Sequence, residues 1–268
     1  MSNRLNKKDF DTLNISNIPS NKEKLLHLLE YFKKNEFTWK EISKSDLNLL
    51  LGLSNETLRK MVNHSAMVGI LNYNDRKYFL SEESSLLLSD KYQLDEYFLH
   101  ILQKSEPLFI NAKIIILLMK LFGGSLKSKS IYTIFSYVGK DRLDNSAQAS
   151  VGRNIRAIFS ILIMMGVITK SKDKIYLNKK SNLLNVLEFS NVQAIESHFN
   201  ENIINVNFIS RYLEQFFIPE VVVKVLSCIS TYETDNYIWS KSSLYKNRGE
   251  VKNLLGDFIM TVIIKRRL

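Results

Sequence analysis

The chain has 268 residues, of which 45% are hydrophobic and 24% charged, and its formal net charge is +10. A chain of this length can form two or three small domains around a substantial core. Its longest apolar run, from Ile114 to Phe122, contains Lys120 and is too short for a membrane-spanning helix, which needs roughly 18 residues. These features exclude a membrane-spanning protein and predict a globular one with no membrane partner.

The single cysteine, Cys228, excludes an internal disulfide framework. The N-terminal residues have no apolar stretch after their basic residues, so we predict no secretory signal. Without a signal or a disulfide framework, the expected location is the cytoplasm.

Composition and pattern divide the chain into five segments. Residues 1–20 are polar and are expected to be held loosely, whereas residues 82–110 lack glycine and have a helical pattern, which predicts a structured connector. The predicted segments are an N-terminal arm at 1–20, a first domain at 21–81, a helical connector at 82–110, a basic second domain at 111–180, and a mostly helical region at 181–268 that could include an incomplete third domain.

The first domain is predicted to contain helices followed by a short β-hairpin. After a leucine-rich helix, Thr38 is placed to cap a short second helix. A longer helix is predicted from Ser54 to about Val68, with Gly69 as its exit. A strand at residues 78–80 completes this domain.

The second domain repeats this order. Its first helix is predicted at Lys113–Phe122, with Gly123-Gly124 as the exit, and a short second helix is expected at Ser130–Val138. A third, longer helix then begins near Ser146 and ends before Gly166.

The long helix of the second domain has two distinct faces. Apolar residues recur at spacings of four and three, which predicts a buried stripe of Val151, Ile155, Ile158, Leu162 and Met165. The opposite face carries small residues and two guanidinium groups, namely Ala149, Arg153, Arg156 and Ser160. A phosphate backbone could therefore approach this face closely.

A β-hairpin is predicted directly after this helix. Val167-Ile168 and Ile175–Leu177 have the composition of two short strands, and a polar segment between them forms the turn. The hairpin carries one acid, Asp173, and three lysines, Lys170, Lys172 and Lys174.

The two domains align as an internal repeat. An offset of 97 residues places Gly69 on Gly166 and Arg59 on Arg156, and the second strand requires one further residue to place Tyr78 on Tyr176. Apolar helices align easily, so chance similarity is the alternative to duplication.

Positive charge is concentrated in one segment. Between Asn111 and Lys180 there are thirteen lysines and arginines and three acids, whereas the rest of the chain has 24 residues of each sign. Such concentration is the electrostatic footprint of a nucleic-acid surface. An acidic membrane surface would also attract it, but that interaction favours a basic helix with Trp or Phe on its apolar face, which this segment matches poorly.

The predicted fold class is mainly α-helical with short β-hairpins. Three motifs carry a resemblance, namely the helix S-x-x-R-N-I-R-A-I, the exit Met-Gly-Val-Ile and the strand K-I-Y-L. With them the second domain resembles winged-helix DNA-binding domains, and residues 21–180 are similar to the DNA-recognition half of type IIS restriction endonucleases. The resemblance implies DNA contacts by Arg153, Asn154 and Arg156, and the nuclease domain of that family has no counterpart. Plasmid replication initiators are similar in architecture.

Duplex DNA is therefore the expected partner, with no cofactor, metal or catalytic residue assigned. The first-domain helix is expected to be the weaker reader, or a protein contact, because Glu56 repels phosphate. Of the two second-domain arginines, Arg153 is expected to contact base edges and Arg156 a flanking phosphate. The predicted contact residues are Arg153, Asn154, Arg156, Ser160, Lys140, Arg142, Lys170, Lys172, Lys174, Arg59, Lys60 and Asn63.

Several functions stay open. The protein could act as a regulator, a replication initiator or the DNA-recognition component of a restriction or defence system. Alternatively, the paired domains could bind a protein partner or a second copy, as in the small subunits of SMC-type complexes, or the basic segment could be a solvated surface without a ligand. A nuclease is the remaining alternative, and its only candidate residues are Asp235, Glu250 and Lys252.

Overall fold

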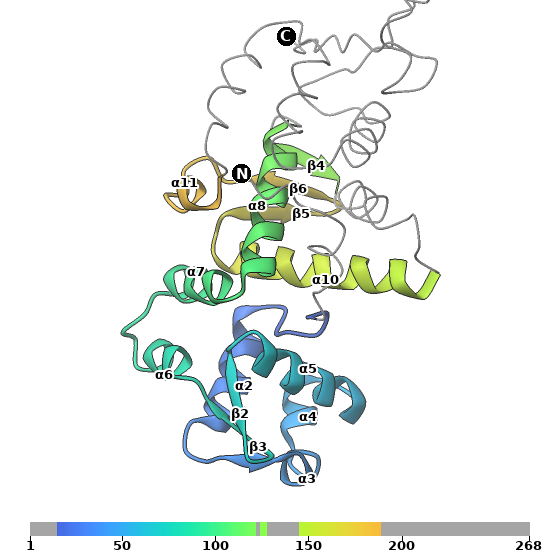
Figure 1. Cartoon of the computed structure of the whole chain (residues 1–268), viewed down its shortest axis with the longest axis vertical. Helices are drawn as coiled ribbons and strands as arrows, with labels where there is room; N and C mark the ends of the chain where they lie inside the picture. The colour runs from blue at the N-terminus through green and yellow to red at the C-terminus, as the bar shows by residue number, and fades with distance from the viewer. Residues whose placement is uncertain (1–14, 122–123, 128–144, 189–268) are drawn as a thin grey trace, which may run out of the picture. The chain divides into compact units, whose positions relative to one another are not determined.

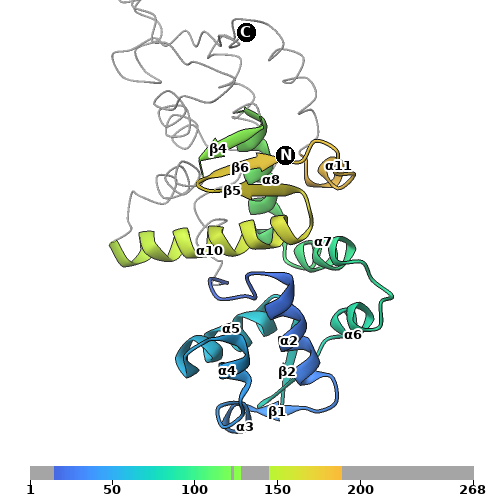
Figure 2. The same cartoon turned by 180° about the vertical axis from the view of Figure 1, so that it is seen from behind.

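The computed structural model describes residues 15–121, 124–127 and 145–188 (Figures 1 and 2). The described part is mainly helical, with two small antiparallel sheets, so the predicted combination of helices and short hairpins is confirmed. Two compact units are present. The first contains residues 13–112 and 149–168, and the second contains the remaining described residues. The domain boundaries drawn from the sequence stay predictions.

The first unit is built around α2 (Lys22–Phe32). Asn21 caps this helix by accepting a 2.9 Å hydrogen bond from the Lys24 N–H. One apolar face is buried, and α2 contacts α4, α6 and β3. Its buried residues are Leu25, Leu28, Leu29 and Phe32, at the helical spacing seen in the sequence.

Strand β1 (Phe37–Thr38) leads into two short helices, α3 (Trp39–Ile42) and α4 (Leu47–Leu51). Thr38 caps α3 as predicted, and a capping box forms because Glu41 accepts from the Thr38 N–H at 2.7 Å. These bonds, first that from the Thr38 backbone, lower the pKa of Glu41.

Helix α5 (Asn55–Met67) is capped by Ser54 and followed by strands β2 (Leu71–Asn74) and β3 (Lys77–Leu80). The predicted glycine exit is confirmed, because Gly69 has a φ of +83°, a conformation that favours glycine. Strand β3 lies between β1 and β2 in an antiparallel sheet. In this sheet Tyr78 is opposite both Phe37 and Tyr73.

The segment before α2 corrects the prediction of a loosely held arm. Ile15 and Ile18 are both buried, and the backbone N–H of Asn17 donates to His64 Nδ1 at 3.1 Å. The prediction was wrong for residues 15–20 because the polar sequence contains two apolar anchors. Residues 1–14 lie outside the described part.

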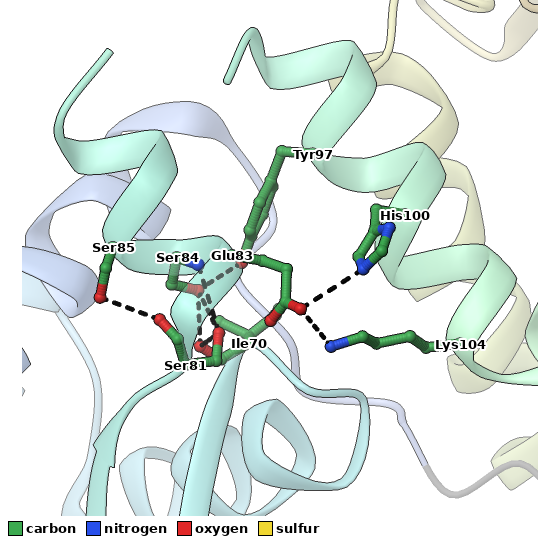
Figure 3. Close-up of polar contacts among 8 residues, drawn as sticks. All are labelled: Ile70, Ser81, Glu83, Ser84, Ser85, Tyr97, His100 and Lys104. Atoms are coloured by element: carbon green, nitrogen blue, oxygen red, sulfur yellow. Dashed lines mark hydrogen bonds and ion pairs between the residues drawn. The ribbon is translucent and has the colours of Figure 1, made fainter. Parts of the chain in front are cut away.

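The predicted helical connector consists of α6 (Glu82–Leu88) and α7 (Leu94–Lys104). Buried hydroxyl groups join it to the hairpin (Figure 3). The Ser84 hydroxyl donates to the Ile70 carbonyl at 2.7 Å and lies 2.8 Å from Tyr97 Oη. Ser81 Oγ also donates to the Ile70 carbonyl, at 3.1 Å.

Helix α8 (Glu106–Leu121) begins seven residues before the predicted start at Lys113. Its first turn contains Pro107, a residue type that in sequence commonly marks the end of the preceding helix. Proline is also tolerated in the first turn of a helix, where its missing N–H has no partner to lose. The buried residues from Ile114 to Met119 occupy every side of the helix.

The second unit contains a second three-stranded sheet. It consists of β4 (Ser125–Lys127), β5 (Ile168–Ser171) and β6 (Lys174–Leu177), with β6 in the middle, and α11 (Leu184–Leu187) follows. The predicted hairpin is confirmed, with longer strands than the sequence suggested.

Helix α10 (Asn145–Met164) precedes this hairpin in the chain. The predicted stripe is buried at Ile155, Ile158, Leu162 and Met165, whereas the side chain of residue 151 lies outside the described part. Ala157, Phe159 and Ile161 are buried as well, so most of the helix circumference is covered over this stretch. The predicted helix at 130–138 and the C-terminal region beyond residue 188 also lie outside the described part.

The internal repeat is present in backbone geometry. The N–H of Ile70 bonds to the Ser65 carbonyl at 2.9 Å, and 97 residues later the N–H of Val167 bonds to the Leu162 carbonyl at 3.0 Å. Both sheets place their last strand in the middle. The two halves of the repeat therefore share both the hydrogen bond that ends the longer helix and the order of strands in the sheet.

One detail of the repeat is corrected. Strands β3 and β6 keep the offset of 97 residues, so Tyr78 corresponds to Ile175 and not to Tyr176. Tyr78 and Ile175 are both buried, and each pairs with the first strand of its sheet. The extra residue in the sequence alignment was wrong because both hairpins have two-residue turns.

Candidate nucleic-acid interface

The exposed strip of α10 is narrow. Between residues 154 and 162 only Arg156 is exposed, and Ser160 is half-buried. The Ser160 hydroxyl donates to the Arg156 carbonyl at 3.1 Å, one turn earlier. Ile163 continues the strip with 38% of its surface exposed. The predicted outward face is therefore present at Arg156 and Ser160, and the side chain of Arg153 lies outside the described part.

Asn154 does not belong to this strip. Its side chain is 7% exposed, and Oδ1 accepts a 3.3 Å hydrogen bond from the backbone N–H of Ile15. The predicted DNA contact of Asn154 is therefore corrected, because the side chain is buried and bonded within the protein.

The β5–β6 hairpin presents the predicted lysines to solvent. Lys170 and Lys172 are exposed and Lys174 is half-buried. Lys172 lies in the turn with a φ of +53°, a left-handed conformation that is uncommon for a lysine. Lys140 and Arg142 lie outside the described part, so their predicted contacts stay predictions.

Helix α5 presents a mixed surface. Arg59 is exposed, and its guanidinium carbon lies 5.8 Å from the centroid of the Trp39 ring, a cation–π arrangement. Lys60 Nζ is 2.5 Å from Glu56 Oε1, one turn earlier. This pair lowers the pKa of Glu56, chiefly through the hydrogen bond, and it compensates the charge of Lys60.

Asn63, the third predicted contact residue of α5, forms a hydrogen bond with a residue of strand β3. Its Oδ1 accepts a 2.5 Å hydrogen bond from the hydroxyl of Tyr78, which is 8% exposed. Sequence reasoning missed Tyr78 and Trp39 as partners of the predicted contact residues. Side chains alternate between the two faces of a strand, so the sequence indicates that Tyr78 lies on one face of the sheet. It does not indicate which helix residue Tyr78 contacts.

Among the described bases of the basic segment, Lys120 and Lys113 are not freely exposed to solvent. Lys120 forms an ion pair with Glu188, and the two side chains are only 10% and 11% exposed. Lys113 is half-buried, and desolvation lowers its pKa. The positive surface is therefore smaller than the sequence count suggests.

A polar cluster lies on α6 and α7. Glu83 points toward His100 and Lys104, and its carboxylate lies 3.3 Å from His100 Nε2 (Figure 3). Burial alone would raise the pKa of Glu83, but the hydrogen bond from Lys104 and nearby positive charge leave it lowered. The nearby Ser84 hydroxyl bonds to Ile70 and Tyr97. The arrangement is thus an ion-pair cluster beside a buried hydroxyl network, without a serine–histidine contact.

Among the described residues, no three His, Cys, Asp or Glu side chains are grouped closely enough to hold a metal ion. None of the helices in the same ranges is long and apolar enough to span a bilayer.

Comparisons with family models, with curated proteins and with solved structures found no match to this chain.

Proposed function

We propose that this protein binds duplex DNA through two winged-helix modules, which are the two predicted domains at residues 21–81 and 111–180. Two features support this fold assignment. In the first module the order is helix, strand, two short helices, a longer helix and a hairpin. The outer strand β1 pairs with β3, as a wing and its flanking strand do. The second module shares the sheet order and the helix exit, and its predicted short helix is a further expectation.

The observation that carries the proposal is the set of outward cations on α10 and on the hairpin that follows it. Arg156, Lys170 and Lys172 are exposed, and neither lysine forms an ion pair with a described residue. Arginine and lysine on a helix and hairpin of this kind can contact base edges and the sugar-phosphate backbone.

The two modules are expected to contribute unequally. On α5 the charge of Lys60 is compensated by Glu56, so Arg59 is the main cation offered by that helix. Module two is therefore the principal source of DNA affinity, whether the protein serves as a regulator, an initiator or a DNA-recognition component of a defence system.

The test is a binding titration of the full chain with duplex and single-stranded DNA over a range of salt concentrations. Each phosphate contact contributes about −0.9 to the slope of log K against log salt on duplex DNA. Several contacts predict a steep slope and a preference for duplex. Arg156→Ala should weaken binding, whereas Lys44→Ala removes another exposed charge outside the basic segment and should have little effect. An affinity that hardly changes with salt would refute the proposal.

A protein-binding adaptor is the second candidate, and one observation favours it. Leu49 and Leu50 on α4 are 74% and 56% exposed, and Met67 at the end of α5 is 62% exposed. Leu49 and Leu50 are adjacent on α4, and neighbouring exposed apolar side chains can contact a protein partner. Loss of complex formation, with unchanged DNA affinity, in a Leu49→Ser/Leu50→Ser variant would support this function.

A further inference from the structure

We infer that Tyr78 is a positioning residue that holds Asn63 as a hydrogen-bond donor, so that α5 prefers guanine to adenine in the DNA major groove. This inference rests on the proposed DNA binding and specifies what the first module reads.

The contact between Tyr78 and Asn63 fixes the orientation of the amide. The Tyr78 hydroxyl donates to Asn63 Oδ1 at 2.5 Å, and the Tyr78 ring is held in the sheet opposite Tyr73, with ring centroids 4.6 Å apart. Burial is the main cause of a raised pKa for Tyr78, so its hydroxyl keeps the proton that it donates. The oxygen of Asn63 is therefore directed toward the sheet.

The amide nitrogen of Asn63 is available for a ligand. No hydrogen bond to Nδ2 is present among the described residues. In the same part of the chain, the only buried side-chain polar atom without a partner is Ser65 Oγ. Because Nδ2 is unpartnered and is not among the buried atoms of this kind, it is at least partly accessible to solvent, and its two N–H groups are available to a ligand.

This orientation changes what asparagine can recognise. A free asparagine reads adenine with both ends of its amide, because Oδ1 accepts from N6 while Nδ2 donates to N7. With Oδ1 engaged by Tyr78, only the donating end remains, and guanine offers two acceptors, O6 and N7, in the major groove.

A second donor lies on the same helix face. Arg59 is four residues before Asn63, so their side chains are neighbours on α5. Its guanidinium group is placed over Trp39 and has donors but no acceptor. The pair thus presents donors only, which matches acceptor-rich base edges and disfavours the adenine amino group.

The second module offers different chemistry at the corresponding positions. At an offset of 97 residues Asn63 corresponds to Ser160 and Tyr78 to Ile175. Ile175 has no hydroxyl group, and the Ser160 hydroxyl hydrogen is used by the Arg156 carbonyl, which leaves Ser160 with oxygen lone pairs to accept. The two helices are therefore expected to differ in base preference despite their common pattern.

The test is selection of binding sites from a duplex library with randomised positions, using the full chain. The base that Asn63 contacts is identified as the position in the site at which Asn63→Ala removes a preference. At that position we expect the wild-type protein to select guanine. Tyr78→Phe keeps the ring but frees the asparagine oxygen. It should raise adenine relative to guanine at that position by roughly tenfold, the scale of one bidentate contact.

Tyr73→Phe is the matched control, since it removes the hydroxyl of an exposed tyrosine, the other ring of the pair, and should leave the preference unchanged. Thermal melting of each variant establishes that it folds. If Tyr78→Phe does not fold, guanine at the position identified by Asn63→Ala still supports the inference, and adenine there overturns it. If Tyr78→Phe folds, binds DNA with wild-type affinity and keeps the wild-type base preference, the inference is overturned. The proposed DNA binding is then unaffected. Absence of any wild-type binding to duplex DNA refutes the proposed function itself.

Discussion

The backbone N–H of Ile15 donates a hydrogen bond to Oδ1 of Asn154, at 3.3 Å and across 139 residues of sequence. Two residues later, the N–H of Asn17 donates to His64 Nδ1. One short segment is thus bonded to α5 through His64 and to α10 through Asn154. Asn154, which the sequence predicted to be a DNA-contacting surface group, therefore stabilises the first compact unit together with His64.

Replacement of Asn154 tests its structural role. Asn154→Ala leaves the Ile15 N–H buried without its acceptor, so the free energy of unfolding should fall by about 1–3 kcal/mol. Ser160→Ala, on the half-buried face of the same helix, should change it by less than about 0.5 kcal/mol. Denaturant unfolding measures both. A loss of DNA affinity in folded Asn154→Ala with unchanged stability would show that Asn154 contacts DNA after all.

The bond to His64 makes stability depend on pH. Burial, and secondarily the charge of Lys60, lowers the pKa of His64 in the folded protein. Nδ1 must also be unprotonated to accept from Asn17. Because the unfolded chain binds the proton more readily, the contribution is fully present above the unfolded pKa of about 6.5 and is lost as pH falls through the lower folded value.

The melting temperature should therefore fall as the pH is lowered from about 7 to 5. His64→Gln, which retains a side-chain acceptor, should reduce this dependence, whereas His27→Gln should retain it. Carboxylates also begin to titrate near the lower end of this range. The role of His64 is therefore judged from the difference in melting temperature between the two variants at each pH. Identical pH profiles for the two variants would argue against a role for His64.

Local signals in the sequence were sufficient for much of the fold. The capping residue Thr38, the glycine exits at 69 and 166 and the stripe through Ile158 depend on neighbours within one or two helical turns, and all were predicted. The start of α8 was missed because a proline after a helix is compatible both with an end and with a new beginning.

The candidate site was less predictable, because its important contacts join residues that are distant in sequence. Asn154 shares the polar character of Arg156, and nothing near it indicates that Ile15 is its partner. Tyr78 orients Asn63 across 15 residues, and Lys120 meets Glu188 from another part of the chain. The pair of Glu56 and Lys60 is the exception, since a spacing of four residues on a helix predicts it.

That pair leads to a prediction about charge on α5. Glu56→Gln removes the partner of Lys60, so the lysine becomes available for phosphate. DNA affinity at low salt should increase, and the salt slope should become steeper by about 0.9. Both side chains are largely exposed, so the stability change should be small.

Glu30→Gln is the matched control for this change. Glu30 also pairs with a nearby lysine, Lys33, at 3.2 Å, but it lies on α2. Both substitutions alter the net charge equally. Equal gains in affinity would show that net charge alone is responsible, and that α5 does not approach DNA.

The last prediction concerns the β5–β6 hairpin. A backbone contact affects all sequences alike, so Lys170→Ala/Lys172→Ala should weaken binding to specific and random duplexes by the same factor. The salt slope should fall by about 1.8, which corresponds to two lost phosphate contacts. Lys34→Ala/Lys91→Ala removes the same charge from two exposed lysines elsewhere and should leave the slope nearly unchanged. If the two double variants behave identically, the hairpin acts only through net charge. If the hairpin variant instead loses affinity for the specific duplex alone, its lysines read bases, and the assignment of the hairpin to the sugar-phosphate backbone is wrong.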